Sequence, residues 1–248
     1  MAMQNTADKI EFGSEELKFF DRDHFDYTKK YPDEFYSRYI RDFQPNTKPR
    51  RGYRIVKRIL DIVISFLGLI LTSPVMLIVA ICIKLDSEGP VIFKQERMGK
   101  DGKIFCCYKF RSMKITAPSD CATSVLENPE EHHTRVGRII RKLSLDELPQ
   151  LWCVFIGTMS FIGYRPLVLT EVKCNDMRAQ LQVFTALPGI SGLAQVEGRD
   201  DVYYKNKAIL DAIYVKNASI SMDAKLFLKT FTVVFQKKGN RDGRSNKK

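Results

Sequence analysis

Residues 62–83 read IVISFLGLILTSPVMLIVAICI, an apolar run that contains no charged side chain. A straight helix of this length would reach about 33 Å, which is enough to cross a bilayer core of about 30 Å. The run therefore predicts a helix embedded in a membrane. A fully buried helix of a soluble protein is the alternative that the length disfavours, because unbroken apolar runs in such helices are usually shorter.

Ser73-Pro74 stands in the middle of this run and predicts a break in the helix. A proline inside a helix removes one backbone donor, and its ring clashes with the preceding turn. Both flanks of the run are basic, with Lys57 and Arg58 before it and Lys84 after it. Because Lys and Arg favour the cytosolic side, both ends are predicted to lie on one face, as a helix-break-helix that enters the membrane and returns. A proline-kinked helix that crosses the bilayer is the alternative.

The net charge of +11 is concentrated in two short segments. Residues 48–58 (KPRRGYRIVKR), the basic collar, carry six basic side chains and no acidic one, and residues 236–248 carry six basic and one acidic. Each basic residue near anionic lipid contributes about 1 kcal/mol. Because a nucleic-acid binder usually spreads its charge over a folded face, this pattern predicts an anionic membrane lipid as partner and no nucleic acid. A solvated linker is the alternative interpretation of the collar.

The pattern predicts an α+β chain that is predominantly helical, with a short β-hairpin and amphipathic surface helices. It divides into an N-terminal extension (1–47), the collar with the membrane helix (48–85), a cytosolic domain (86–236) and a basic tail (237–248). The hairpin is expected at 91–94 and 103–110, around the turn residues 99–102. Helices are expected in 32–43, 135–156, 168–186, 205–214 and 223–236, the second of these interrupted by a turn.

The segment SLDELPQL at 144–151 holds the candidate chemistry. One interpretation is structural: Ser144 and Glu147 form a capping box, or Asp146 caps a helix that has Pro149 in its first turn. The other is catalytic, with a carboxylate nucleophile beside a carboxylate metal ligand in the pair Asp146-Glu147, at a positive helix N-terminus. Spacing alone does not decide between them.

A carboxylate that attacks a phosphate ester must approach another anion. At about 4 Å and an effective dielectric near 20, each such pair costs about 4 kcal/mol, which a divalent cation and arginines offset. Basic residues are close in sequence, at Arg138, Arg141, Lys142 and Arg165. Two other acidic or histidine clusters invite a metal interpretation, His132-His133 and Asp200-Asp201, but both lie in polar stretches where solvated surface is the usual role.

Several motifs, in this order, resemble the monotopic phosphoglycosyl transferases of the bacterial sugar transferase family. They are KRILD at 57–61, LTSP at 71–74, FxQxRxG at 93–99, YKFRSM at 108–113, RxLSLDELPQL at 141–151, MSFIG at 159–163, PGIxGLAQV at 188–196 and GR at 198–199. The resemblance implies a re-entrant helix broken at Ser73-Pro74 and a cytosolic catalytic domain on the bacterial inner membrane. It implies transfer of a sugar-1-phosphate from a UDP-sugar to polyprenyl (undecaprenyl) phosphate, with Mg²⁺ and release of UMP, at the start of surface polysaccharide or glycoconjugate assembly.

The same resemblance assigns roles to individual residues. Asp146 would form a covalent phospho-sugar intermediate, Glu147 would hold Mg²⁺ with it, and Lys109 and Asp223 match positions needed for activity, Asp223 through SMDAK at 221–225. The predicted substrate-binding residues are Arg141, Arg165, Arg199, Gln195, Pro188 and Gly189. Homodimerisation, the sugar and the role of residues 1–47 are left open.

The chain departs from the family pattern at Tyr164, where a proline is usual, at Cys153, where an asparagine is usual, and at Glu197 and Asp200, beside Gly198-Arg199. These departures motivate one alternative, a weakly active or inactive membrane-tethered scaffold of the same fold. Another alternative is a metal-dependent glycosyltransferase that uses Asp200-Asp201 and releases UDP.

Overall fold

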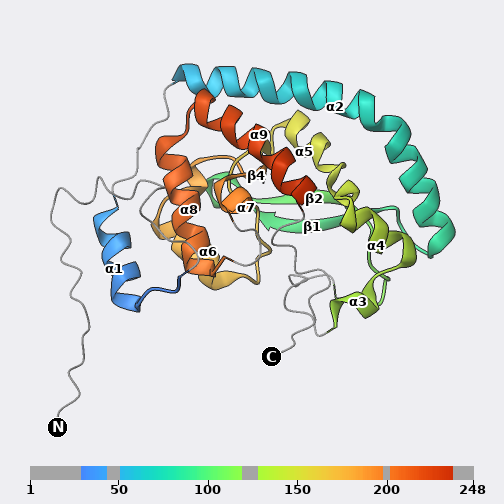
Figure 1. Ribbon diagram of the computed structural model, residues 1–248, viewed down its shortest axis with the longest axis horizontal. Coiled ribbons are helices and arrows are strands. Elements are labelled where there is room, and N and C mark those ends of the chain that lie inside the picture. Colours follow the sequence, from blue (N-terminus) through green and yellow to red (C-terminus); the bar gives the residue numbers. More distant parts are fainter. Residues whose placement is uncertain (1–28, 44–50, 119–127, 198–201, 237–248) are drawn as a thin grey trace, which may run out of the picture.

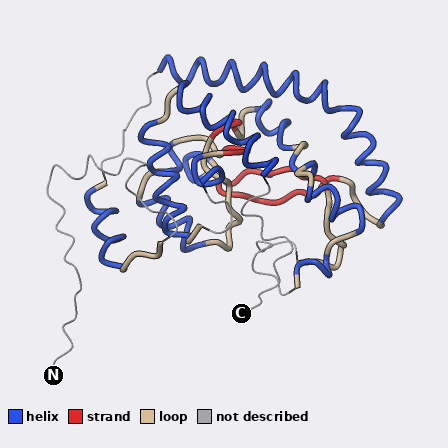
Figure 2. The backbone as a smooth tube through the Cα atoms, in the orientation of Figure 1, coloured by secondary structure: helices blue, strands red, loops and turns tan. Residues whose placement is uncertain are grey.

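The computed structural model describes residues 29–43, 51–118, 128–197 and 202–236 of the chain. Within these ranges the chain is mainly helical, with two small two-stranded sheets (Figure 1). The helices are α1 (Asp33–Asp42), α2 (Arg51–Asp86), α3 (Pro129–His132), α4 (Arg135–Lys142), α5 (Gln150–Ile156), α6 (Val172–Gln180), α7 (Leu193–Glu197), α8 (Tyr204–Asn217) and α9 (Ile220–Gln236). The strands are β1 (Ile92–Met98), β2 (Ile104–Phe110), β3 (Ser160–Ile162) and β4 (Gly189–Ser191), and 3₁₀ turns occur at η2 (Lys100–Gly102), η4 (Leu145–Glu147) and η5 (Val183–Thr185). Figure 2 shows the strands in the middle of the molecule, with helices around them.

The apolar run forms part of α2, a single helix that contains Pro74 in its interior. Because proline has no N–H, the carbonyl of Ile70, four residues earlier, loses its helical donor. The Ser73 hydroxyl donates to this carbonyl instead, at 2.8 Å, so that the acceptor stays satisfied. The predicted interruption at Ser73-Pro74 is therefore corrected to a bend in a continuous helix, which Figure 1 shows.

The first half of α2 is attached to the rest of the molecule by polar contacts. The Arg58 guanidinium donates to the carbonyls of Val154 and Phe155, both at 2.7 Å, and thereby supplies donors to the C-terminal end of α5. The buried carboxylate of Asp61 accepts hydrogen bonds from the Ser160 hydroxyl and the Phe161 N–H, both at 3.1 Å. These contacts fix α2 against α5 and β3.

The second half of α2 packs through apolar side chains. Val79 and Ile83 are buried in a cluster with Phe110 of β2 and Ile140 of α4. At the end of the helix the Asp86 carboxylate accepts from the N–H of Val136 at 2.9 Å, which supplies an acceptor at the start of α4. Both halves of α2 therefore contact the same body.

The outer face of α2 is apolar and exposed. Leu71, Leu77 and Leu85 are 76%, 63% and 83% exposed, and only 11% of the most apolar part of the helix is buried. In the described part of the chain, α2 is the one helix long and apolar enough to cross a membrane. Apolar surface of this extent is unfavourable in water, so the face is suited to lipid.

The predicted β-hairpin is confirmed. Strands β1 and β2 are antiparallel, and their register pairs Phe93 with Lys109. The turn η2 contains Asp101 and Gly102 at φ +56° and +70°, a left-handed conformation that Asp and Gly tolerate. The register places Lys109 near the end of β2, beside the turn η4.

The second sheet was not predicted from the sequence. Its parallel strands β3 and β4 pair Ser160 with Gly189 and Ile162 with Ser191. A Cβ on Gly189 would lie 2.1 Å from the backbone N of Gly163. Only glycine at this position therefore allows the two backbones to lie so close together. Strands of three residues are too short to show a period of two in sequence.

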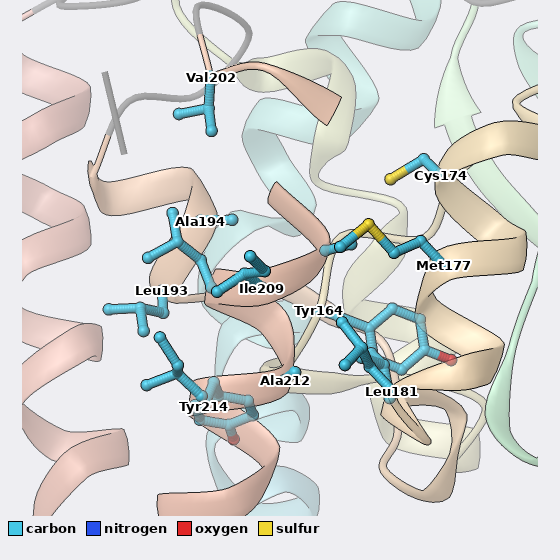
Figure 3. Packing of buried hydrophobic residues seen from close by; sticks show 14 of the residues in the cluster. Tyr164, Cys174, Met177, Leu181, Leu193, Ala194, Val202, Ile209, Ala212 and Tyr214 are labelled. Atoms are coloured by element: carbon cyan, nitrogen blue, oxygen red, sulfur yellow. The ribbon is translucent and has the colours of Figure 1, made fainter. Parts of the chain in front are cut away.

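The main core surrounds α8, whose central residues are completely or almost completely buried (Figure 3). Helix α1, predicted as a short amphipathic helix in 32–43, docks on this core through Tyr36 and Tyr39. The Tyr36 hydroxyl donates to the Asn206 Oδ1 at 2.7 Å. The N-terminal extension therefore contributes buried side chains to the main core.

The expected helices are present, with changed ends. The predicted helix-turn-helix in 135–156 is α4, η4 and α5, and the helices expected in 205–214 and 223–236 are α8 and α9. Helix α6 is shorter than the predicted 168–186. The predicted α+β, mainly helical chain is thus confirmed, while its re-entrant membrane topology and its division into domains stay predictions.

Candidate active site

Three separate segments bring charged side chains to one place. Lys109 extends from β2, Glu147 from the turn η4, and Arg165 from the irregular segment after β3. The Lys109 Nζ lies 2.8 Å from the Glu147 Oε1, and the Arg165 Nη2 lies 3.5 Å from the same oxygen. Asp146 precedes Glu147 in this turn and is only 7% exposed. The structure therefore gathers four of the predicted site residues.

The turn η4 takes its shape from Ser144. This residue has φ +57°, a left-handed conformation that follows and ends α4. Its side chain makes no capping hydrogen bond. The N-cap residue of α5 is Pro149, and no side-chain hydrogen bond caps that helix. Both structural interpretations, the Ser144–Glu147 capping box and the Asp146 cap, are therefore wrong. The two carboxylates lie on a tight turn between helices and not at a helix N-cap.

The pKa values of the two neighbouring carboxylates are shifted in opposite directions. Burial raises the pKa of Asp146 to about 6, and the nearby Glu147 anion adds to this effect, while Lys109 opposes it. Burial also acts to raise the pKa of Glu147, but the Lys109 and Arg165 cations outweigh it and hold that pKa below its usual value. Arg141, from the last turn of α4, lowers both pKa values. Glu147 is therefore a paired anion, and Asp146 is a desolvated acid beside it.

Asp223 occupies a different network. Its Oδ2 lies 2.7 Å from the Lys57 Nζ and accepts from the Tyr53 hydroxyl at 2.9 Å, and its Oδ1 accepts from the Tyr214 hydroxyl at 2.8 Å. In the described part of the chain, no hydrogen bond or ion pair joins Asp223 to the Asp146 turn. Asp223 instead connects α9 to α8 and to the first half of α2.

Lys57 and Arg58 were assigned to the lipid-binding collar from sequence. The structure places their cationic groups on protein acceptors, on Asp223 and on the carbonyls at the end of α5. The partners Tyr53 and Tyr214 were not predicted. A tyrosine and a lysine four residues apart, with an acid in a distant helix, give no sequence signal that the three meet.

In the described part of the chain, no hydrogen bond or ion pair joins Pro188, Gly189 or Gln195 to Glu147. Pro188 and Gly189 belong to the pairing of β4 with β3, where the Ser160 N–H donates to the Pro188 carbonyl at 2.8 Å. Gln195 lies in α7, with both amide atoms buried. Arg199, with Asp200 and Asp201, lies outside the described residues.

The positions that depart from the family pattern are accommodated inside the fold. Cys153 is completely buried, burial raises the pKa of its thiol to about 11, and its Sγ lies 3.8 Å from the Cys106 carbonyl. Tyr164 is also completely buried. Glu197 makes an ion pair with Lys229 of α9 at 2.9 Å.

Residues 52–237 match the family described as bacterial sugar transferase. The "Undecaprenyl-phosphate galactose phosphotransferase" of Salmonella typhimurium is 39% identical over 210 residues, which cover 78% of this chain and 43% of that protein. The "UDP-glucose:undecaprenyl-phosphate glucose-1-phosphate transferase" of Klebsiella pneumoniae is 38% identical over 73% of this chain and 41% of that protein.

The chain thus spans less than half the length of these two relatives. A third relative, the "Exopolysaccharide production protein ExoY" of Sinorhizobium fredii, is 34% identical over 75% of this chain and 88% of its own length. The family match includes α2 and the candidate active site. It begins after α1, so that the N-terminal extension lies outside it. On this similarity, the chain belongs to the bacterial sugar transferase family.

Proposed function

We propose that this protein is a phosphoglycosyl transferase, which moves a sugar-1-phosphate from a UDP-sugar to polyprenyl phosphate and releases UMP. Transfer of this kind would begin the assembly of a surface polysaccharide or glycoconjugate. The observation that carries the proposal is the desolvated acid Asp146 beside the Lys109–Glu147–Arg165 cluster, in a chain of this family. Fixed cations at such a turn offset the repulsion between an attacking carboxylate and a phosphate.

In the proposed reaction, an Asp146 carboxylate oxygen attacks the phosphorus that carries the sugar. A bond forms between this oxygen and phosphorus, the pyrophosphate P–O bond breaks, and UMP leaves with the electron pair. A phosphate oxygen of the polyprenyl phosphate then attacks the same phosphorus and returns the carboxylate to Asp146. Arg141 and Arg165 bind the phosphate groups, and Lys109 holds Glu147 in place through the 2.8 Å ion pair.

The carboxylates of Asp146 and Glu147 fit an Mg²⁺ ion that is bound jointly by the protein and by substrate phosphates. No group of three or more His, Cys, Asp or Glu side chains suited to a metal occurs among the described residues, but Mg²⁺ commonly uses one or two carboxylates together with substrate phosphates and water. Two carboxylates are therefore available to hold the ion. One is Glu147, whose Oε1 contacts Lys109 and Arg165, and the other is Asp146. When bound, Mg²⁺ would neutralise charge on the pyrophosphate.

The decisive test is the identity of the released nucleotide. The purified protein is incubated in lipid nanodiscs with undecaprenyl phosphate, MgCl₂ and, separately, UDP-galactose, UDP-glucose and UDP-N-acetylgalactosamine, and the nucleotides are separated by chromatography. We expect UMP that depends on the lipid acceptor. Release of UDP would favour the metal-dependent glycosyltransferase, and absence of any nucleotide product with all donors would favour the scaffold.

We also propose that α2 enters the membrane from the cytosolic face and returns to it. Two observations support this topology: the exposed apolar face of α2, and the attachment of both its halves to one body. A helix crossing the bilayer would carry one of its ends away from that body. The exposed side chains of Arg51 and Arg54, in the first turns of α2, would then face anionic headgroups.

Arg51→Cys and Glu88→Cys, each as the sole cysteine, test this topology, because Arg51 begins α2, Glu88 follows its end, and both are exposed. We expect a membrane-impermeant maleimide to label both from the cytosolic face only. Pro74→Ala restores a helical donor and favours a straighter helix, so we expect part of the Glu88→Cys population to become accessible from the opposite face. Labelling of the two sites from opposite faces in the protein with Pro74 intact would contradict the proposed topology.

A further inference from the structure

The segment Arg165–Val168 has no regular secondary structure, yet all four of its carbonyls are bound from outside the segment. The Arg178 guanidinium donates to the Arg165 carbonyl at 2.9 Å, and the Arg97 guanidinium donates to the Pro166 carbonyl at 2.8 Å. The Met98 N–H donates to the Leu167 carbonyl at 3.2 Å, and the Asn175 amide donates to the Val168 carbonyl at 3.1 Å. A loop held at each of four consecutive carbonyls has little freedom to move.

Arg178 is the most deeply buried of these donors. It has no exposed surface. Its Nη1 donates to the Arg165 carbonyl, and its Nη2 pairs with Asp211 of α8 at 2.5 Å. Its guanidinium also lies 5.4 Å from the centre of the Tyr164 ring, and Figure 3 shows this ring between side chains of α6 and α8. One planar guanidinium therefore joins α8, the Tyr164 ring and the backbone of Arg165.

A buried Arg–Asp pair is not an efficient source of stability. Desolvation of the two charges offsets their attraction, and well-packed apolar residues of similar volume often stabilise a fold equally well. A lysine would pair with Asp211 but lacks the fork that reaches two acceptors at once. The geometry of Arg178 is thus better explained by what it orients than by the stability of its ion pair.

We propose that Arg178, fixed by Asp211, is a positioning residue for Arg165. By holding the Arg165 carbonyl it fixes the backbone from which the Arg165 side chain reaches to 3.5 Å from the Glu147 Oε1. Asn175 lies three residues before Arg178 on the same face of α6 and holds the other end of the segment. The inference rests on the proposed function, in which Arg165 binds phosphate of the donor.

The test replaces the pair as a unit, Arg178→Met with Asp211→Leu, so that no charge is left buried without its partner. Because a displacement of about 1 Å at a catalytic group can cost about 10²-fold in rate, we expect a loss of about that size in kcat/KM for the UDP-sugar. Arg165→Ala is expected to cause a similar loss. In the Arg165→Ala background, the double replacement should add less than about a twofold loss, because it acts through Arg165.

If the loss from Arg165→Ala and the loss from the double replacement instead multiply in the combined protein, the inference is overturned, because a general structural defect does not depend on Arg165. The matched control is Lys205→Met with Asp33→Leu, which removes another ion pair of α8, one that joins it to α1 at 2.6 Å. This control is expected to leave kcat/KM unchanged.

Hydrogen exchange separates this inference from the proposed function. We expect the amides of Arg165, Leu167 and Val168 to exchange faster in the Arg178→Met, Asp211→Leu protein than in the control, with α8 itself still protected. Unchanged exchange there would refute positioning by Arg178 even if activity falls. If exchange rises while the wild-type protein releases no UMP, the positioning is correct and the proposed function fails.

Discussion

Asp146→Asn is expected to abolish UMP release, with a loss of at least about 10³-fold in turnover. Asparagine has nearly the same shape as aspartate, but its neutral amide is a poor nucleophile toward phosphorus. The substitution should also prevent the covalent phospho-sugar adduct that we expect when the wild-type protein is incubated with donor in the absence of lipid acceptor. Nucleotide chromatography measures the first effect, and intact-mass spectrometry followed by peptide mapping measures the second.

The fold should survive this substitution. Asp146 is buried, and burial raises its pKa, so a neutral amide removes a desolvated acid without removing an ion pair that the structure shows. Asp101→Asn is the matched control, because Asp101 is exposed at the tip of the hairpin in a left-handed conformation that asparagine also tolerates. Substantial turnover by the Asp146→Asn protein, or an adduct on another peptide, would exclude Asp146 as the nucleophile.

Lys109→Met is expected to reduce kcat/KM by about 10²- to 10³-fold, the range seen when one fixed charge-stabilising group is lost from an active site. Methionine keeps the unbranched apolar stem of lysine without its charged amine, so that Glu147 loses its partner at 2.8 Å and retains Arg165 at 3.5 Å. The carboxylate would consequently compete for Arg165, which we assign to phosphate of the donor. Steady-state kinetics with varied UDP-sugar should show both a lower kcat and a higher KM.

Lys94→Met provides the comparison for this change. Lys94 lies in β1 of the same hairpin, is exposed and has Tyr108 as its cross-strand neighbour, so that its side chain points to the other face from Lys109. We expect the Lys94→Met protein to keep near-wild-type kinetics. Equal losses from the two substitutions would assign the effect to the hairpin as a whole and not to the contact with Glu147.

The sequence was sufficient to predict the elements with strong local signals. The hairpin followed from its turn residues Gly99–Gly102, and the long apolar helix α2 from its apolar run. The helix continued through Pro74 because of a contact that no hydropathy pattern contains, the Ser73 hydroxyl on the Ile70 carbonyl. The paired strands β3 and β4 escaped prediction because they are short and distant in sequence.

The motifs identified residues that the structure places in two different networks. Lys109, Asp146, Glu147 and Arg165 were identified through motifs and do meet in space. Asp223 belonged to the same set of predictions but is held by Lys57, Tyr53 and Tyr214. Motif membership marks a residue as important without saying what it touches, since long-range pairing is decided by packing.

The polar contacts of α2 affect how the protein can be divided. Asp61 binds the Phe161 N–H, Asp86 binds the Val136 N–H, and Arg58 completes the end of α5. A fragment made water-soluble by omission of this helix would therefore expose backbone groups as well as lose its tether. Similarly, a substitution at Asp61 would disturb the start of β3 at Ser160 and Phe161, although Asp61 itself belongs to α2.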